Sequence, residues 1–161
     1  MNTVYTHYYN NGIGRFDSEV FKPIKNLEVC YLNKPDNDTG FWGSPLMSEY
    51  GWKQWCKDNM PEWIDGASCF CFTLSDDANI LSLNSKSDLE EFINQNPEMI
   101  IHNGLSEDLS FACSVVFDFE KMLNSGIDAI EVKIKDLYYG IMYGWDCDSI
   151  LIMNPAVVIN V

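Results

Sequence analysis

Two carboxylates stand directly before a strongly apolar run near the C-terminus of the chain. Asp146 and Asp148 precede the sequence Ile-Leu-Ile-Met at residues 150–153, which has the composition of a buried strand. A carboxylate at the mouth of a core strand is held rigidly while it stays half exposed to water. Such a group can stabilise developing positive charge, or accept a proton from an attacking group. One of the two is therefore a candidate catalytic acid, and the alternative is a turn residue.

Other polar residues lie beside aromatic residues at separated points of the chain. Imidazole, hydroxyl and ammonium groups form directional hydrogen bonds, and aromatic side chains offer flat faces for stacking. The candidate binding residues of this kind are His7, Tyr8, Lys34, Trp42, Ser44 and Ser149. Each also has a common structural explanation: a Trp is often core, a Ser before Pro often makes a turn, and a loop Lys is often a solvated charge. Trp52, Trp55 and Cys56, at helical spacing, are interpreted as core packing.

Known sequence motifs exclude several kinds of chemistry. The chain contains no Walker-type or Rossmann-type glycine motif, no His-Glu-x-x-His motif and no Gly-x-Ser-x-Gly motif. Its six Cys include no Cys-x-x-Cys pair, and two His are few for a metal hydrolase. We therefore expect no metal site and expect the thiols to be reduced.

Composition and charge limit the class of protein. The 161 residues are 47% hydrophobic, enough for one domain with a sizeable core. The net charge of −14 argues against binding of a nucleic-acid phosphate backbone. No apolar run is long enough to span a membrane, and the N-terminus lacks the pattern of a signal peptide. The expected location is therefore cytoplasmic, without membrane contact.

The elements that must position these residues follow from apolar patterning and turn signals. Strands are expected over residues 3–9, 27–32, 41–45, 69–74, 80–83, 127–134, 138–142, 149–153 and 157–161. Helices are expected over residues 48–59, 85–94 and 117–124, with a short amphipathic segment at 18–24. Ser48 and Ser85 are the predicted caps of the first two helices. Helices early in the chain and strands at its end predict an α+β fold with a mixed or antiparallel sheet.

Several short motifs follow one another along the chain. They are His-Tyr-Tyr at 7–9, Lys-Pro at 34–35, Gly-Phe-Trp-Gly-Ser at 40–44, Trp-Lys-Gln-Trp-Cys at 52–56, Asp-Phe at 118–119, Gly-Ile-Asp-Ala-Ile at 126–130 and Trp-Asp-Cys-Asp-Ser at 145–149. Their order resembles one branch of the ADP-ribosyltransferase superfamily. The chain departs from the pattern in three ways. Tyr9 replaces a Ser, residues between Pro35 and Gly40 form an insertion, and no Gln-x-Glu or Glu-x-Glu dyad is present.

The resemblance implies a fold and an activity. The fold would be a single ADP-ribosyltransferase-like domain over residues 1–161, with a mixed, mainly antiparallel β-sheet core in two packed halves and two to three helices. The activity would be NAD-dependent transfer of ADP-ribose to an unidentified acceptor, expected to be a protein, with release of nicotinamide. This reaction passes through an oxocarbenium-like state that a fixed carboxylate stabilises.

Roles for individual residues follow from the same resemblance. Asp146 occupies the position of the family's Trp-Asp motif and is the favoured acid, with Asp148 second. His7 and Ser44 would fix the nicotinamide ribose, Trp42 would line the ring pocket, and Lys34 would meet the pyrophosphate. Tyr8 and Ser149 complete the expected NAD-binding set.

Three other interpretations stay open. A non-enzymatic acidic protein of the nucleic-acid mimic type would block a basic partner surface. An NAD binder that has lost turnover would keep the cleft without releasing nicotinamide. An effector of viral or mobile-element origin would combine the enzyme and the acidic-surface readings. The enzyme reading requires that His7, Trp42, Ser44 and Asp146 converge on one cleft.

Overall fold

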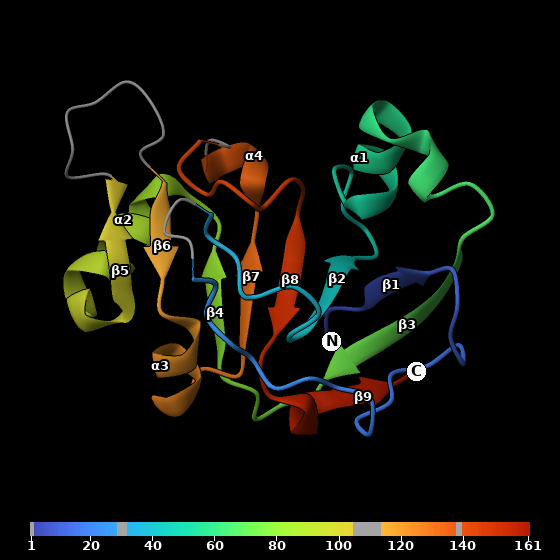
Figure 1. Ribbon diagram of the computed structural model, residues 1–161, viewed down its shortest axis with the longest axis horizontal. Coiled ribbons are helices and arrows are strands. Elements are labelled where there is room, and N and C mark those ends of the chain that lie inside the picture. Colours follow the sequence, from blue (N-terminus) through green and yellow to red (C-terminus); the bar gives the residue numbers. More distant parts are fainter. Residues whose placement is uncertain (1, 29–31, 105–113, 138–139) are drawn as a thin grey trace.

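The centre of the computed structural model is a mostly antiparallel sheet with strand order β4-β7-β8-β2-β1-β3-β9 (Figure 1). The structure describes residues 2–28, 32–104, 114–137 and 140–161. The strands of this sheet are β1 (Tyr5–Tyr9), β2 (Phe41–Pro45), β3 (Ser68–Leu74), β4 (Ile80–Leu83), β7 (Ala129–Val132), β8 (Ser149–Ile152) and β9 (Val158–Asn160). A small second sheet pairs β5 (Ile100–Asn103) with β6 (Val115–Phe117). Of the pairings between described strands, only that of β4 with β7 is parallel.

Helices cover one side and one end of this sheet. They are α1 (Trp52–Asn59), α2 (Lys86–Gln95), α3 (Phe119–Asn124) and α4 (Ile134–Leu137), with 3₁₀ turns at Pro61–Trp63, Pro97–Met99 and Pro155–Val157. The predicted α+β class with a mainly antiparallel sheet is confirmed. Among the described helices, not one has the length and apolar character needed to cross a membrane.

The sheet curls, so that two apolar clusters form on its opposite faces. In Figure 1, β4, β7 and β8 run up and down the view, whereas β1, β3 and β9 run across it. Ile150 and Ile152 of β8 pack with Tyr5 and Phe72 between the two halves of the sheet. Leu151, on the other face, packs into the larger cluster that includes α2 and α3 residues. Burial on both faces explains why β8 is a continuous apolar run.

The N-cap of α2 is the predicted one, whereas that of α1 is not. Ser85 caps α2 as predicted, because its side chain accepts the Asp88 N–H. The prediction that Ser48 caps the first helix is wrong. Gly51 occupies the cap position of α1, and the hydroxyl of Ser44, from the neighbouring strand, accepts the Trp52 N–H at 2.9 Å. This cap is tertiary, so local sequence did not indicate it.

Over the described residues, the observed structure differs from three of the predicted elements. Residues 18–24 form a turn and extended chain rather than a helix. Residues 27, 28 and 32 are not strand, and the rest of that predicted strand, 29–31, lies outside the described residues. Residues 140–142 form a turn instead of a strand, and 138–139 again lie outside the description.

Two further boundaries moved, and one sheet was not predicted. The helix predicted from residue 117 begins at Phe119, because Phe117 ends β6 and Asp118 caps α3 by accepting the Lys121 N–H. The strand predicted over 127–134 ends at Val132, and the four-residue α4 begins at Ile134. Neither β5 nor β6 was expected, since each is three or four residues long.

Both glycines of the Gly-Phe-Trp-Gly-Ser motif are required by close packing. Gly40 has φ +70°, and a Cβ there would lie 2.8 Å from Leu151 Cδ1. A Cβ on Gly43 would lie 2.7 Å from Phe72 Cζ. The motif is therefore explained at these two positions by the fold itself.

We expect Gly43→Ala to lower the free energy of unfolding by about 1–3 kcal/mol, the usual cost of overpacking. The physical reason is the contact with Phe72. Urea unfolding followed by circular dichroism measures the change. Adding Phe72→Leu should recover part of the loss, so the double variant should cost less than the sum of the singles. Strictly additive costs would contradict the proposed clash.

Candidate functional site

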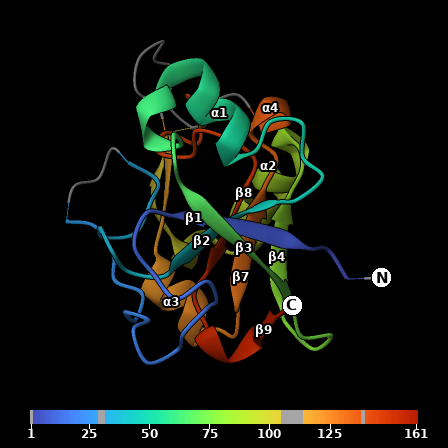
Figure 2. The same ribbon diagram turned by 90° about the vertical axis from the view of Figure 1, so that its right-hand side faces the viewer.

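A pocket of about 480 Å³ lies beside the place where β8 begins. We call it the central pocket. Every candidate residue except Asp148 lines it: His7, Tyr8, Lys34, Trp42, Ser44, Asp146 and Ser149. The fold brings these separate stretches together because β2 pairs with both β1 and β8. Figure 2 shows α1 and α4 standing at one end of the sheet, and α1 supplies a further wall through Trp52.

His7 is held in one orientation and one tautomer. Its Nδ1 lies 2.7 Å from the carbonyl oxygen of Trp42, and because a carbonyl only accepts, Nδ1 is the donor. The ring centroid lies 4.6 Å from that of Phe41 and 5.3 Å from that of Phe70. Burial lowers the pKa of His7, against an opposing effect of the Trp42 carbonyl. The imidazole is therefore neutral at pH 7, with Nε2 able to accept a hydrogen bond from a ligand hydroxyl.

Trp42 is supported from behind by the buried core. Its ring meets Trp145 edge to face, with centroids 4.7 Å apart. Trp145 is 1% exposed, and its Nε1 donates to the carbonyl of Asn33. Asn33 is itself fully buried and accepts the Phe117 N–H at 2.9 Å through Oδ1. These contacts fix one wall of the central pocket, and Asn33 is a supporting residue that sequence reasoning missed.

The two candidate serines are both buried and serve the fold. Ser44 accepts the Trp52 N–H, and Ser149 donates to the carbonyl of Cys147 at 2.9 Å. The Ser44 hydroxyl also hydrogen-bonds the Cys147 thiol, and it can turn its proton to a ligand instead. Burial raises the pKa of the Cys147 thiol to about 11, so it is protonated and unreactive at neutral pH.

Lys34 and Tyr8 supply polar groups to the lining of the central pocket. The Lys34 ammonium donates to Asn37 Oδ1 at 3.1 Å, within the polar loop that precedes β2. Tyr8 is half buried and pairs with Cys69 across β1 and β3. Burial raises the Tyr8 pKa, so the phenol is neutral and can donate a hydrogen bond.

Asp146 is half buried on the border between the central pocket and a second space. That second space, which we call the outer cleft, has a volume of about 1080 Å³. Glu131 lines the outer cleft and accepts a hydrogen bond from the buried Tyr5 hydroxyl. Sequence reasoning missed Glu131, because a single polar residue in an apolar strand such as β7 has the same pattern as a solvated charge.

The structure places Asp148 away from the central pocket, in the outer cleft. Its Oδ2 accepts the Ser48 hydroxyl at 2.7 Å, and its Oδ1 accepts the Ile134 N–H at 3.1 Å. The Asp148 N–H donates to the carbonyl of Tyr50. Asp148 thus ties β8 to the loop before α1 and to the start of α4.

We expect Asp148→Ala to lower the free energy of unfolding by about 2–4 kcal/mol, because two hydrogen bonds to a charged acceptor are lost. Ser48→Ala, the matched control, removes only one of them and should cost about 1 kcal/mol. The double variant should cost less than the sum, since both changes break the same contact. Chemical denaturation measures all three, and a change within about 0.5 kcal/mol for Asp148→Ala would disprove this role.

The tryptophans of α1 do not pack into the core, contrary to the prediction. Trp52 and Trp55 stack with centroids 5.1 Å apart, and Trp63 lies 5.9 Å from Trp52. Trp52 and Trp63 line the central pocket, whereas Trp55 lines the outer cleft. Cys56 is the buried residue of this helix. The cluster forms an aromatic wall between the two spaces, which helical spacing alone did not distinguish from a core face.

Two further sources of functional information are groups of metal-binding side chains and similarity to known proteins. Within residues 2–28, 32–104, 114–137 and 140–161, no group of three or more His, Cys, Asp or Glu side chains is placed to hold a metal ion. Comparisons with protein-family models, curated proteins and solved structures found no match to this chain. The function of this chain is therefore inferred from the residues of the site itself.

Proposed function

We propose that this chain is an NAD-dependent ADP-ribosyltransferase of the kind its motifs resemble. The observation that carries the proposal is that residues from four separate stretches of the chain line one pocket. These are the residues that the motif resemblance assigns to NAD binding and catalysis. A volume of about 480 Å³ falls in the range of small-molecule sites.

The chemical groups of the central pocket suit the nicotinamide ribose end of NAD. Trp42 would present an aromatic surface to the nicotinamide ring. His7 would accept a hydrogen bond from a ribose hydroxyl at Nε2, because Nδ1 already donates to the Trp42 carbonyl. Ser44 would donate its proton. Asp146 would stabilise the ribosyl cation as the bond to nicotinamide breaks.

The position of Asp146 also supports transfer to an acceptor. A group in the outer cleft would approach the ribose from the side on which Asp146 forms the border. The same carboxylate can then orient that group or accept its proton. Asp148, which the resemblance left as a second acid, is assigned instead to support of the surrounding backbone, because both of its oxygens accept protein hydrogen bonds.

The test is nicotinamide release from NAD by the purified chain, alone and with a cell lysate, together with calorimetric titration of NAD. Labelling of a lysate protein by labelled NAD, with release of nicotinamide, supports a transferase and identifies the acceptor. Release by the chain alone, with water as the acceptor, would show an NAD hydrolase. Binding without release would mean an NAD binder that lacks turnover. Neither binding nor release would refute the proposal and leave the acidic binding protein as the working hypothesis.

A further inference from the structure

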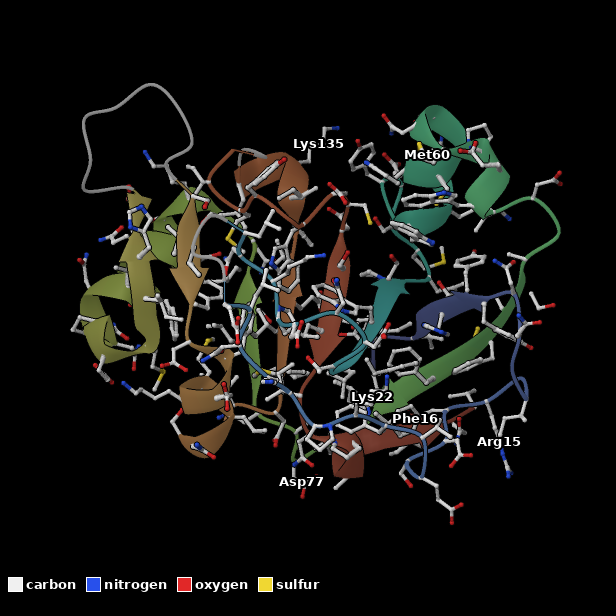
Figure 3. The ribbon with its side chains drawn as sticks, in the orientation of Figure 1. Arg15, Phe16, Lys22, Met60, Asp77 and Lys135 are labelled. Carbon is white, nitrogen blue, oxygen red and sulfur yellow. The ribbon has the colours of Figure 1, made fainter. Side chains whose placement is uncertain are left out.

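The outer cleft is formed by the segment after β2, the end of β7 and the start of α4. Its volume of about 1080 Å³ lies at the upper limit of small-molecule sites, which is about 1000 Å³. The cleft therefore has room for several residues of a polypeptide. Figure 3 labels Lys135, which lines this cleft, on α4 at the end of the molecule where α1 also stands.

Glu131 places a carboxylate beside an apolar cluster at this cleft. It lies opposite Ile150 in the pairing of β7 with β8 and two residues after Ala129, so the three side chains share one face of the sheet. Ile150, Ala129 and Tyr5 belong to the apolar cluster on that face. The buried Tyr5 hydroxyl donates to Glu131 and holds the carboxylate in place. A carboxylate has about four acceptor positions, so Glu131 can still accept hydrogen bonds from a ligand.

Carboxylates outnumber ammonium groups in the lining of the outer cleft. The carboxylates are those of Glu49, Glu131, Asp146 and Asp148, and the ammonium groups are those of Lys133 and Lys135. Both lysines are exposed and belong to one short segment, so their long side chains can turn toward water. The net charge of −14 adds a long-range field of the same sign. The electrostatics of the cleft therefore favour a basic ligand over an acidic one.

The lining also presents aromatic and apolar surface. Tyr50 and Trp55 are half buried, and Met47 is 88% exposed. Aromatic faces attract guanidinium groups through cation–π contact and stacking, whereas a methionine adapts its shape to different apolar partners. Leu46, next to Met47, is 50% exposed and extends this apolar surface. Such a lining suits a segment in which arginine stands next to apolar residues.

We infer that the outer cleft is a docking site for a basic segment of another protein, with an arginine bonded to Glu131 and an apolar neighbour on Met47. The charge of the lining selects this occupant, and its aromatic residues favour arginine over lysine. The inference concerns recognition of a partner and does not depend on NAD chemistry. It applies equally to a transferase and to a non-enzymatic acidic protein.

The experiment titrates a capped hexapeptide of alternating arginine and leucine into the full chain by calorimetry. A hexapeptide of alternating glutamate and leucine is the matched probe and should not bind. We expect Glu131→Gln to weaken binding of the basic peptide about tenfold, since a charge-assisted hydrogen bond is lost. Glu49→Gln should weaken it about twofold, whereas Lys135→Gln should strengthen it about twofold, because both are exposed charges of opposite sign.

Asp77→Asn is the control for the loss of one negative charge. Asp77 is exposed in the turn between β3 and β4 and lines neither the central pocket nor the outer cleft. Figure 3 labels it at the opposite end of the molecule from Lys135. Asp77→Asn should leave peptide binding unchanged, whereas Trp55→Leu should weaken it about threefold through loss of cation–π contact. Circular dichroism verifies that each variant is folded.

The outcomes separate this inference from the proposed function. Binding of the basic peptide that Glu131→Gln weakens and Lys135→Gln strengthens supports the docking site, whether or not the chain releases nicotinamide. No binding, or an equal change in Asp77→Asn and Glu131→Gln, would overturn the docking site and leave the transferase proposal standing. Equal affinity for the glutamate peptide would also overturn it, because the cleft would then not recognise charge.

Discussion

Asp146→Asn should lower the rate of nicotinamide release from NAD by about 10²–10³-fold while NAD affinity changes little. The factor is that expected when one preorganised electrostatic contact to a transition state is removed. The amide keeps the size and a hydrogen-bonding oxygen of the carboxylate but removes its charge. Because the ground-state ribose carries no full positive charge, the loss should fall mainly on kcat rather than on binding. Steady-state release assays and calorimetric titration of NAD measure the two effects separately.

Two matched variants make this test specific. Asp148→Asn changes the same charge two residues away, but Asp148 bonds Ser48 and Ile134 rather than lining the central pocket. Asp148→Asn should lower the free energy of unfolding, while the folded protein should keep most of its rate of nicotinamide release. Glu131→Gln keeps an acceptor for Tyr5 and removes the charge from the outer cleft. Activity that survives Asp146→Asn but is lost in Glu131→Gln would move the role of the acid to Glu131.

The parts of the fold that could be predicted from the sequence are those with a strong local pattern of apolar, turn or capping residues. The apolar run of β8 and the bounded run 41–45 of β2 were located from composition and turn residues alone. The cap of α2 was also predicted, since Ser85 and Asp88 are local partners. Local patterns do not show which strands pair with one another. The order of β1, β2 and β8 in the sheet is therefore known only from the structure.

The errors have a common physical cause, which is contact between residues distant in sequence. Ser44 caps α1 from a strand, and Asp148 holds the start of α4 from fourteen residues away in the chain. Trp52 has the spacing of a core face, yet it lines the central pocket and stacks with Trp63. In each case the local sequence allowed several structures, and tertiary contacts selected one.

The candidate site was easier to predict than its individual roles. His7, Trp42 and Asp146 were selected by motif order, and the fold places them around one pocket. Their spacing gave no indication that Asp146 would also border the outer cleft or that Glu131 would lie there. A strand residue reveals which face it occupies only when its partners are known, so Glu131 could not be distinguished from a solvated charge.

Trp145→Ala should have the largest effect on stability, a loss of about 3–5 kcal/mol in the free energy of unfolding. Trp145 is among the largest fully buried side chains of the described chain and packs against Trp42. The substitution leaves a cavity, and it also leaves the buried Asn33 carbonyl without its indole donor. Since a typical domain is stable by only 5–15 kcal/mol, the variant should unfold at a clearly lower urea concentration.

Trp145→Phe separates the two contributions to this loss. Phenylalanine fills most of the volume and can still meet Trp42 by its edge, but it cannot donate to Asn33. Its cost should therefore be about 1–3 kcal/mol, the price of one unsatisfied buried carbonyl. Trp52→Ala, which removes a half-buried ring at the pocket wall, should cost less than Trp145→Ala. Equal losses for Trp52→Ala and Trp145→Ala in circular dichroism would contradict the assignment of Trp145 as the core support of the central pocket. Under the proposed function, Trp145→Phe should also weaken NAD binding, because Trp145 bonds the carbonyl of Asn33, the neighbour of the pocket residue Lys34.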